Sequence, residues 1–274
     1  MSGEMEDFFL HIPILVYHRI IADDGLGNAS GNAVPVSMFE RQMRYLHDHD
    51  YHSLSLVECL QSSRGAATRH KKIFAITFDD GFEDFSTLAL PILRRYGFKA
   101  TMFLVTDYLE DNNHSDNSTT ASPLLDWKQV KRLSEEGVDF GSHTCSHPHL
   151  PRLSSELIYH ELVESKKCLE TELGCEIPFL AYPYGESNSE VCRIAMKAGY
   201  DAACGVITGK RGSFNLWRRP CGARDTLPAF AFRLTRWYDY ILRFRGWIRD
   251  ETTVGHYLRQ AKHNWLSESN RRSK

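Results

Sequence analysis

The sequence alternates between short apolar runs and segments with helical periodicity. The apolar runs lie at 14–17, 73–78, 100–105, 138–140, 179–181 and 202–206. Helical patterns lie between most of them, at 38–49, 84–96, 127–136, 154–173 and 188–198, and Pro91 should kink or split the second of these. Repeated strand–helix alternation is typical of a parallel sheet with helices outside it, so the pattern predicts an α/β fold. The periodicity leaves open whether the sheet closes into a barrel.

Composition and charge exclude several classes of protein. The chain has 274 residues, of which 42% are hydrophobic and 25% are charged, with a formal net charge of −2. These values are ordinary for a globular protein and exclude collagen, coiled coil and disorder. The balanced charge also speaks against nucleic acid as a partner, because no net positive field would attract it.

Cysteine usage and the N-terminal residues bear on the cellular compartment. Seven cysteines are scattered along the chain without a CxxC pair, which predicts free thiols in a reducing compartment. Residues 1–7 are acidic where a signal peptide needs positive charge, and no stretch approaches the ~18 apolar residues that span a bilayer. The sequence therefore predicts a cytoplasmic protein. Residues 111–122 are predicted to form a polar loop. The glycosylation sequon at 117–119 should not be modified in that compartment.

The first motif is the segment 77–81, Thr-Phe-Asp-Asp-Gly, which places Asp79 and Asp80 directly after a predicted strand. Ligands of parallel α/β proteins bind at the carboxyl ends of the strands, so both acids could reach such a site. Adjacent carboxylates resist joint ionisation unless a cation lies beside them. On its own, an Asp-Asp-Gly tripeptide is more typical of a solvated turn.

The second motif places His143 and His147 after another predicted strand. If this segment forms a helical turn, imidazoles four residues apart project to the same side, which suits a zinc-like ion. Two solvated histidines are the commoner interpretation of the pair alone. With Asp80, however, the pair gives three candidate ligands and leaves one coordination position open for water, as catalytic metal sites do.

The third motif, Pro183-Tyr184-Gly185, also follows a predicted strand. Proline and glycine shape a fixed loop whose backbone amides could face a developing oxyanion. As sequence alone, the motif is more typical of a simple turn.

Together, the three motifs resemble those of the polysaccharide deacetylase family (the NodB-homology domain, carbohydrate esterase family 4). The resemblance covers about 14–219 and implies a distorted (β/α)7-type barrel, with one domain at 1–225 and a helical extension at 226–274. It implies metal-dependent removal of N-acetyl groups from an amino-sugar polysaccharide or oligosaccharide. By position, Asp79 corresponds to the catalytic base, and Asp80, His143 and His147 to the metal ligands. The backbone N–H of Tyr184 corresponds to the oxyanion donor.

Two positions depart from the common pattern of this family. Ala181 stands where many members carry the arginine that orients the base, and the late catalytic-histidine motif is missing, with His256 the best late candidate. Both departures resemble the poly-N-acetylglucosamine deacetylase branch, in which the acid histidine comes from an N-terminal strand. That branch implies His18 as the catalytic acid, and it leaves Arg218 or Arg219 as the orienting arginine.

Several alternatives stay open from the sequence. Zinc is the default for this ligand set, although cobalt, nickel or iron could occupy it. A metal phosphoesterase would use similar ligands, and a degenerate carbohydrate-binding module would keep the fold without turnover. Residues 233–249 interleave basic and aromatic side chains, which favours a helix packed on the barrel or, less commonly, contact with an anionic membrane. In the second case the substrate could be a lipid-linked sugar.

Overall fold

The computed structural model describes residues 8–9, 12–24, 32–62, 72–110, 123–206, 211–235 and 237–241. The chain divides into two units, 1–230 and 231–274, and each is described by itself. The boundary at 225/226 and the helical extension stay predictions. In the second unit, the described residues include the end of helix α9 (Leu227–Arg233) and a short helical segment at 237–241.

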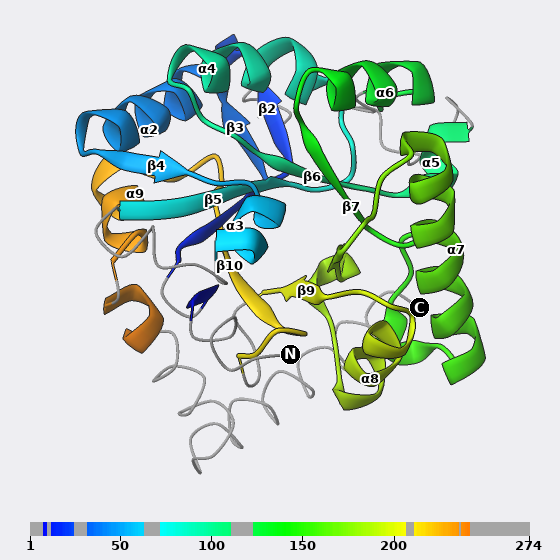
Figure 1. Ribbon diagram of the computed structural model, residues 1–274. Coiled ribbons are helices and arrows are strands. Elements are labelled where there is room, and N and C mark those ends of the chain that lie inside the picture. Colours follow the sequence, from blue (N-terminus) through cyan, green and yellow to red (C-terminus); the bar gives the residue numbers. More distant parts are fainter. Residues whose placement is uncertain are drawn as a thin grey trace, which may run out of the picture. The chain divides into compact units, whose positions relative to one another are not determined.

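Seven parallel strands of the first unit close into a barrel (Figure 1). The ring closes where β5 pairs with β1, with Ile14 opposite Ala75. In order around the ring, the strands are β1 (Ile14–Tyr17), β10 (Leu216–Pro220), β9 (Ala202–Gly205), β8 (Phe179–Ala181), β7 (Asp139–Ser142), β6 (Thr101–Leu104) and β5 (Lys72–Phe78). The predicted (β/α)7 barrel is therefore confirmed, and all six predicted apolar runs coincide with its strands.

Among the described residues, four strands were not predicted from the sequence. β10 is one of the seven barrel strands. Its two arginines interrupt the apolar pattern, so it does not read as an apolar run. The other three are short: β4 (Tyr51–Ser53) pairs with the first residues of β5, and β2 (Arg19–Ile21) pairs with β3 (Ala33–Pro35) in a separate sheet.

Helices surround the barrel strands (Figure 1). Four of the predicted helices are α2 (Val36–Asp48), α6 (Trp127–Glu135), α7 (Ser155–Leu173) and α8 (Ser189–Lys197). The predicted helix at 84–96 is split, as Pro91 indicated, into a π-helix at Phe85–Ala89 and α4 (Leu90–Arg95). Other helical elements of the described residues are α3 (Leu56–Ser62), α5 (Thr106–Glu110), and short 3-10 turns at Leu150–Arg152 and Pro183–Gly185.

The barrel interior is a packed core and not a channel. Side chains from most of its strands meet there with residues of α3 and with Phe9, which is 1% exposed. The strand residues of this cluster are Ile14, Ala75, Phe103, Phe179, Ala181, Ala202, Cys204 and Leu216. Gly141 of β7 leaves room for this packing, because a Cβ there would lie 2.4 Å from the Phe103 ring. A substrate can therefore reach the barrel only at a rim.

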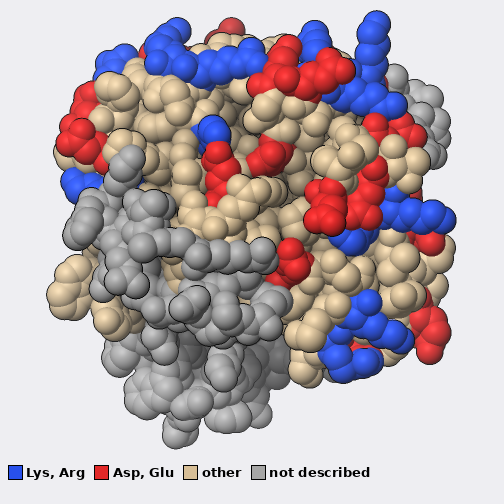
Figure 2. Space-filling view, viewed as in Figure 1, with Lys and Arg blue, Asp and Glu red and all other residues tan. Residues whose placement is uncertain are grey.

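The outer surface carries charges of both signs close together over α4 and α6 (Figure 2). Arg94 pairs with Glu136 and Lys131 pairs with Glu172, each at 2.7 Å. Exposed pairs of this kind contribute about 0–1 kcal/mol, so the apolar core dominates stability. No helix within the described ranges is long and apolar enough to cross a membrane. All seven cysteines are free thiols, as predicted.

Candidate metal and active site

The predicted site residues converge at the carboxyl ends of the barrel strands. Asp79 and Asp80 follow β5, His143 follows β7, and His18 follows β1. The strand ends are joined by backbone hydrogen bonds, since the Asp79 N–H donates to the Tyr17 carbonyl at 3.0 Å. Parallel strands bring their carboxyl ends to one edge, which is why residues distant in sequence meet here.

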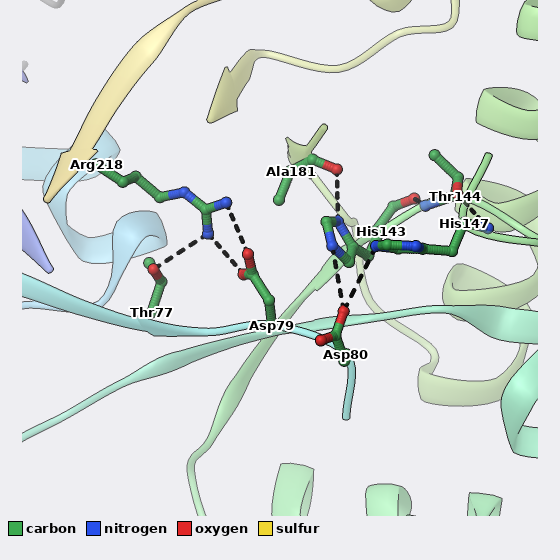
Figure 3. Close-up of polar contacts among 9 residues, drawn as sticks. Thr77, Asp79, Asp80, His143, Thr144, His147, Ala181 and Arg218 are labelled. Atoms are coloured by element: carbon green, nitrogen blue, oxygen red, sulfur yellow. Dashed lines mark hydrogen bonds and ion pairs between the residues drawn. The ribbon is translucent and has the colours of Figure 1, made fainter. Parts of the chain in front are cut away.

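Asp80, His143 and His147 form a cluster of metal-ligand type (Figure 3). Their ligand atoms all lie within 4.8 Å of one another. The Asp80 Oδ1 atom lies 3.5 Å from His143 Nε2 and 3.6 Å from His147 Nε2. Two imidazole nitrogens and one carboxylate oxygen are a donor set that zinc prefers in catalytic sites.

Protonation and ring orientation also fit a bound cation. His143 Nδ1 donates to the Ala181 carbonyl at 2.7 Å, so Nε2 carries the free lone pair and faces Asp80. Burial lowers the pKa of His143 to about 3, and the effect of Asp79, which raises it, is smaller. The imidazole is therefore neutral at pH 7, as a metal ligand must be.

The segment between the two histidines is not the helical turn that the sequence suggested. Residues 143–149 are non-helical, and both Thr144 (φ 74°) and His147 (φ 59°) are left-handed. The His147 N–H donates to Thr144 Oγ1 at 3.0 Å. The two imidazoles thus converge through a bent loop, and their ring centroids lie 4.8 Å apart.

Asp79 pairs with an arginine and is not part of the cluster formed by Asp80, His143 and His147. Arg218 Nη1 and Nη2 donate to the two carboxylate oxygens of Asp79 at 2.6 and 2.8 Å, and Nη1 also donates to Thr77 Oγ1 at 3.3 Å (Figure 3). Both charged side chains are buried, at 3% and 1% exposure. Burial alone would raise the pKa of Asp79, but Arg218, with smaller effects of His143 and His18, lowers it to about 2.

The structure distinguishes the two candidate arginines. Arg218 points into the barrel toward Asp79, whereas Arg219 interacts electrostatically with Tyr51, as expected for the next residue along a strand. Sequence reasoning could not choose between them because it did not recognise β10. The sequence signal that could have identified this strand is the run Leu-Trp-Arg-Arg-Pro at Leu216–Pro220.

His18 is half-buried and close enough to Asp79 and Arg218 for their charges to act on it. Burial lowers its pKa, the Asp79 carboxylate opposes that shift, and the Arg218 guanidinium adds to it. A lowered pKa makes an imidazolium a stronger acid, and it also leaves a smaller fraction of the His18 ring protonated at neutral pH. The alternative late histidine, His256, lies outside the described residues, as do the loop at 111–122 and its sequon.

Tyr184 lies beside the triad in the turn that follows β8. Its backbone is left-handed (φ 58°), and its side chain is 54% exposed. The phenol ring lies between two imidazoles: its centroid is 4.7 Å from His147, and it stacks on His149 at 3.9 Å. His149 in turn contacts Glu186, with 2.9 Å between Nδ1 and Oε2. The Tyr184 side chain thus lies against His147, one of the candidate metal ligands.

The fold is a closed (β/α)7 barrel. One rim carries a His/His/Asp cluster and, beside it, an aspartate paired with an arginine. These features define a barrel protein with a candidate metal site. Residues 66–203 match the family model described as polysaccharide deacetylase. The chain belongs to this family.

Individual relatives agree with that assignment. The protein YxkH of Bacillus subtilis (strain 168) is 32% identical over 199 residues, which make up 72% of this chain and 64% of that relative. The chain thus spans less than two thirds of that relative's length. The poly-beta-1,6-N-acetyl-D-glucosamine N-deacetylase of Staphylococcus aureus (strain MSSA476) is 28% identical over 68% of each chain. The solved structure of the Streptococcus pyogenes deacetylase PplD in complex with acetate has a TM-score of 0.71 and 28% identity, covering 82% of this chain and 98% of that one.

Proposed function

We propose that this chain is a metal-dependent hydrolase that removes N-acetyl groups from an amino-sugar polysaccharide or oligosaccharide. The observation that carries the proposal is the placement of the Arg218-paired Asp79 next to the Asp80, His143 and His147 cluster. A base and a Lewis-acid site side by side are what attack of water on an amide carbonyl requires.

In this proposal Asp80, His143 and His147 hold a divalent cation, with zinc the first candidate, and cobalt, nickel and iron as alternatives. When bound, such a cation supplies Lewis-acid chemistry, because it polarises a carbonyl and lowers the pKa of water. The fit is supported by the neutral His143, whose Nε2 lone pair faces the carboxylate of Asp80.

In this proposal, residues of the chain itself carry out the proton transfers and stabilise the oxyanion. Asp79 accepts the proton of the attacking water, since the Arg218 pairing keeps its carboxylate ionised at neutral pH. The backbone N–H of Tyr184 donates to the oxyanion of the tetrahedral intermediate. His18 protonates the leaving amine, so that the carbon–nitrogen bond breaks to give acetate and a free amino group.

The deciding experiment is acetate release from N-acetylglucosamine oligomers by zinc-loaded protein. β-1,6-linked oligomers are the first substrates to test, because the Staphylococcus aureus relative is named for that polymer. We expect release by the wild type, and a fall of at least about 10²-fold in Asp79→Asn with zinc still bound. Asp80→Ala should lose both the metal and activity.

The outcomes separate the competing functions. Full activity in Asp79→Asn would refute Asp79 as the base. Hydrolysis of phosphate esters without acetate release would instead identify a phosphoesterase. Bound zinc with neither reaction would favour a carbohydrate-binding module.

We also propose that the stretch 233–249 contacts an anionic membrane, which would bring a lipid-linked sugar within the range of substrates. Trp237 and Tyr240 are 71% and 61% exposed, and residues 242–249 lie outside the described part of the chain. Co-sedimentation with phosphatidylserine-containing vesicles should fall in Trp237→Ser and stay unchanged in the control Tyr159→Ser. Equal binding by wild type and Trp237→Ser would refute this contact. A cytoplasmic location stays a prediction.

A further inference from the structure

The loop between the two histidine ligands has an unusual backbone. Thr144 and His147 both have positive φ values, 74° and 59°, in the left-handed region that non-glycine residues rarely adopt. Such conformations persist only where the surrounding structure determines them. Contacts from outside the loop must therefore hold it in this shape.

Glu161, on α7, makes the largest set of such contacts with the loop. Its Oε2 atom accepts hydrogen bonds from the backbone N–H groups of Cys145 and Ser146, at 2.9 and 3.0 Å. Its Oε1 atom accepts from the Ser146 hydroxyl at 2.7 Å. Its carbonyl oxygen accepts from the Cys145 thiol at 3.4 Å. Glu161 of a barrel helix thus contacts two of the three residues between the histidines, Cys145 and Ser146.

The two histidine ligands depend on this loop to different degrees. The ring of His143 is oriented from β8, by the hydrogen bond to the Ala181 carbonyl. His147 comes after the loop, so the position of its Cα follows directly from the conformation of residues 144–146. A relaxed loop would move His147 away from Asp80, while His143 would stay in place.

We propose that Glu161 is a positioning residue that holds His147 within reach of Asp80 and so sets the affinity of the triad for a divalent metal. This inference rests on the proposed metal site. The hydrogen bonds of Glu161 act through the loop, because its carboxylate accepts from the backbone N–H groups of Cys145 and Ser146 and from the Ser146 hydroxyl, and these belong to the loop between the two histidines. Outer partners of this kind typically change metal affinity 10–100-fold when removed.

The test is the zinc dissociation constant of the full chain, measured by competition with a chromophoric chelator. Glu161→Ala should raise it about 10–100-fold. Glu161→Gln should stay close to the wild type, because its amide oxygen can accept both backbone hydrogen bonds and its amino group can donate to Ser146 Oγ. Glu164→Ala is the matched control, since Glu164 lies one turn further along α7 and is exposed. It should leave the constant unchanged.

Each outcome supports or overturns the inference. Wild-type affinity in Glu161→Ala overturns it, and an equal loss in Glu161→Ala and Glu161→Gln overturns the hydrogen-bond basis. Acetate release by Glu161→Ala should return at saturating zinc, because positioning affects metal occupancy first. If Glu161→Ala does not fold, Glu161→Asp replaces it: its carboxylate is one methylene short of the loop, so weaker zinc binding is expected again. If the wild type itself binds no zinc, the proposed metal site fails instead.

Discussion

Asp79 and Asp80 are adjacent in sequence but differ completely in their surroundings. Asp79 directly follows β5 and turns into the barrel, where Arg218 pairs with it. Asp80 has a left-handed backbone (φ 73°), which directs its carboxylate to the two imidazoles instead (Figure 3). A single change of backbone region thus separates the proposed base from the candidate metal ligand, and Gly81 (φ 79°) continues the turn.

The buried Arg218–Asp79 pair leads to the first stability prediction. Arg218→Met removes one partner and leaves an uncompensated carboxylate in the barrel, which typically costs 3–5 kcal/mol, so we expect about that loss of unfolding free energy. The measurement is urea denaturation of the metal-free protein. The double variant Arg218→Met/Asp79→Asn should recover part of the loss, because no charge is then left unpaired. A single variant as stable as the wild type would contradict the buried pair.

At the scale of elements, the turn at Pro183–Gly185 combines two left-handed residues in succession. Tyr184 has φ 58° and Gly185 has φ 66°. A Cβ at Gly185 would lie 2.4 Å from Val206 Cγ1, so the turn packs directly against the residue after β9. The position of the Tyr184 N–H therefore depends on a glycine at 185.

We expect Gly185→Ala to destabilise the protein by about 1–3 kcal/mol, since it adds both backbone strain and a clash. It should also lower kcat for acetate release, because the turn that carries the Tyr184 N–H must shift. Thermal unfolding and steady-state kinetics together test this. The matched control is Gly174→Ala, where φ is 66° but no atom lies within 4 Å of the added Cβ. That variant should lose stability without losing kcat, and identical behaviour of the two variants would contradict the argument.

The elements that sequence could predict are those whose residues are apolar or locally patterned. The six strand runs were visible because buried parallel strands are continuously apolar. β10 was not visible, because Arg218 is neutralised by a carboxylate 139 residues away, and that pairing exists only in the folded barrel. The bend between His143 and His147 was equally hidden: four-residue spacing suggests a helix, whereas the actual loop depends on Glu161, a residue of a different element.

At the scale of the whole barrel, the candidate metal ligands connect two strands and a loop. Asp80 follows β5 and His143 follows β7, and these strands are separated by β6 in the ring. A cation bound by all three ligands would therefore link segments across the rim, and it would bind the folded chain but not the unfolded one. Binding of that kind shifts the unfolding equilibrium by mass action.

Zinc should accordingly raise the melting temperature of the metal-free protein. At a free concentration of about 100 times the dissociation constant the gain is about 2.7 kcal/mol. For a barrel of this size that corresponds to about 5–11 °C, measured by thermal unfolding monitored by circular dichroism. A chelator should reverse the shift, and Asp80→Ala should abolish it because one of three ligands is gone. The control Asp48→Ala changes an exposed aspartate at the end of α2 and should keep the full shift. An undiminished shift in Asp80→Ala would mean that zinc binds elsewhere. Without the Asp80 carboxylate the site keeps only its two imidazoles, and two ligands bind zinc more weakly than three.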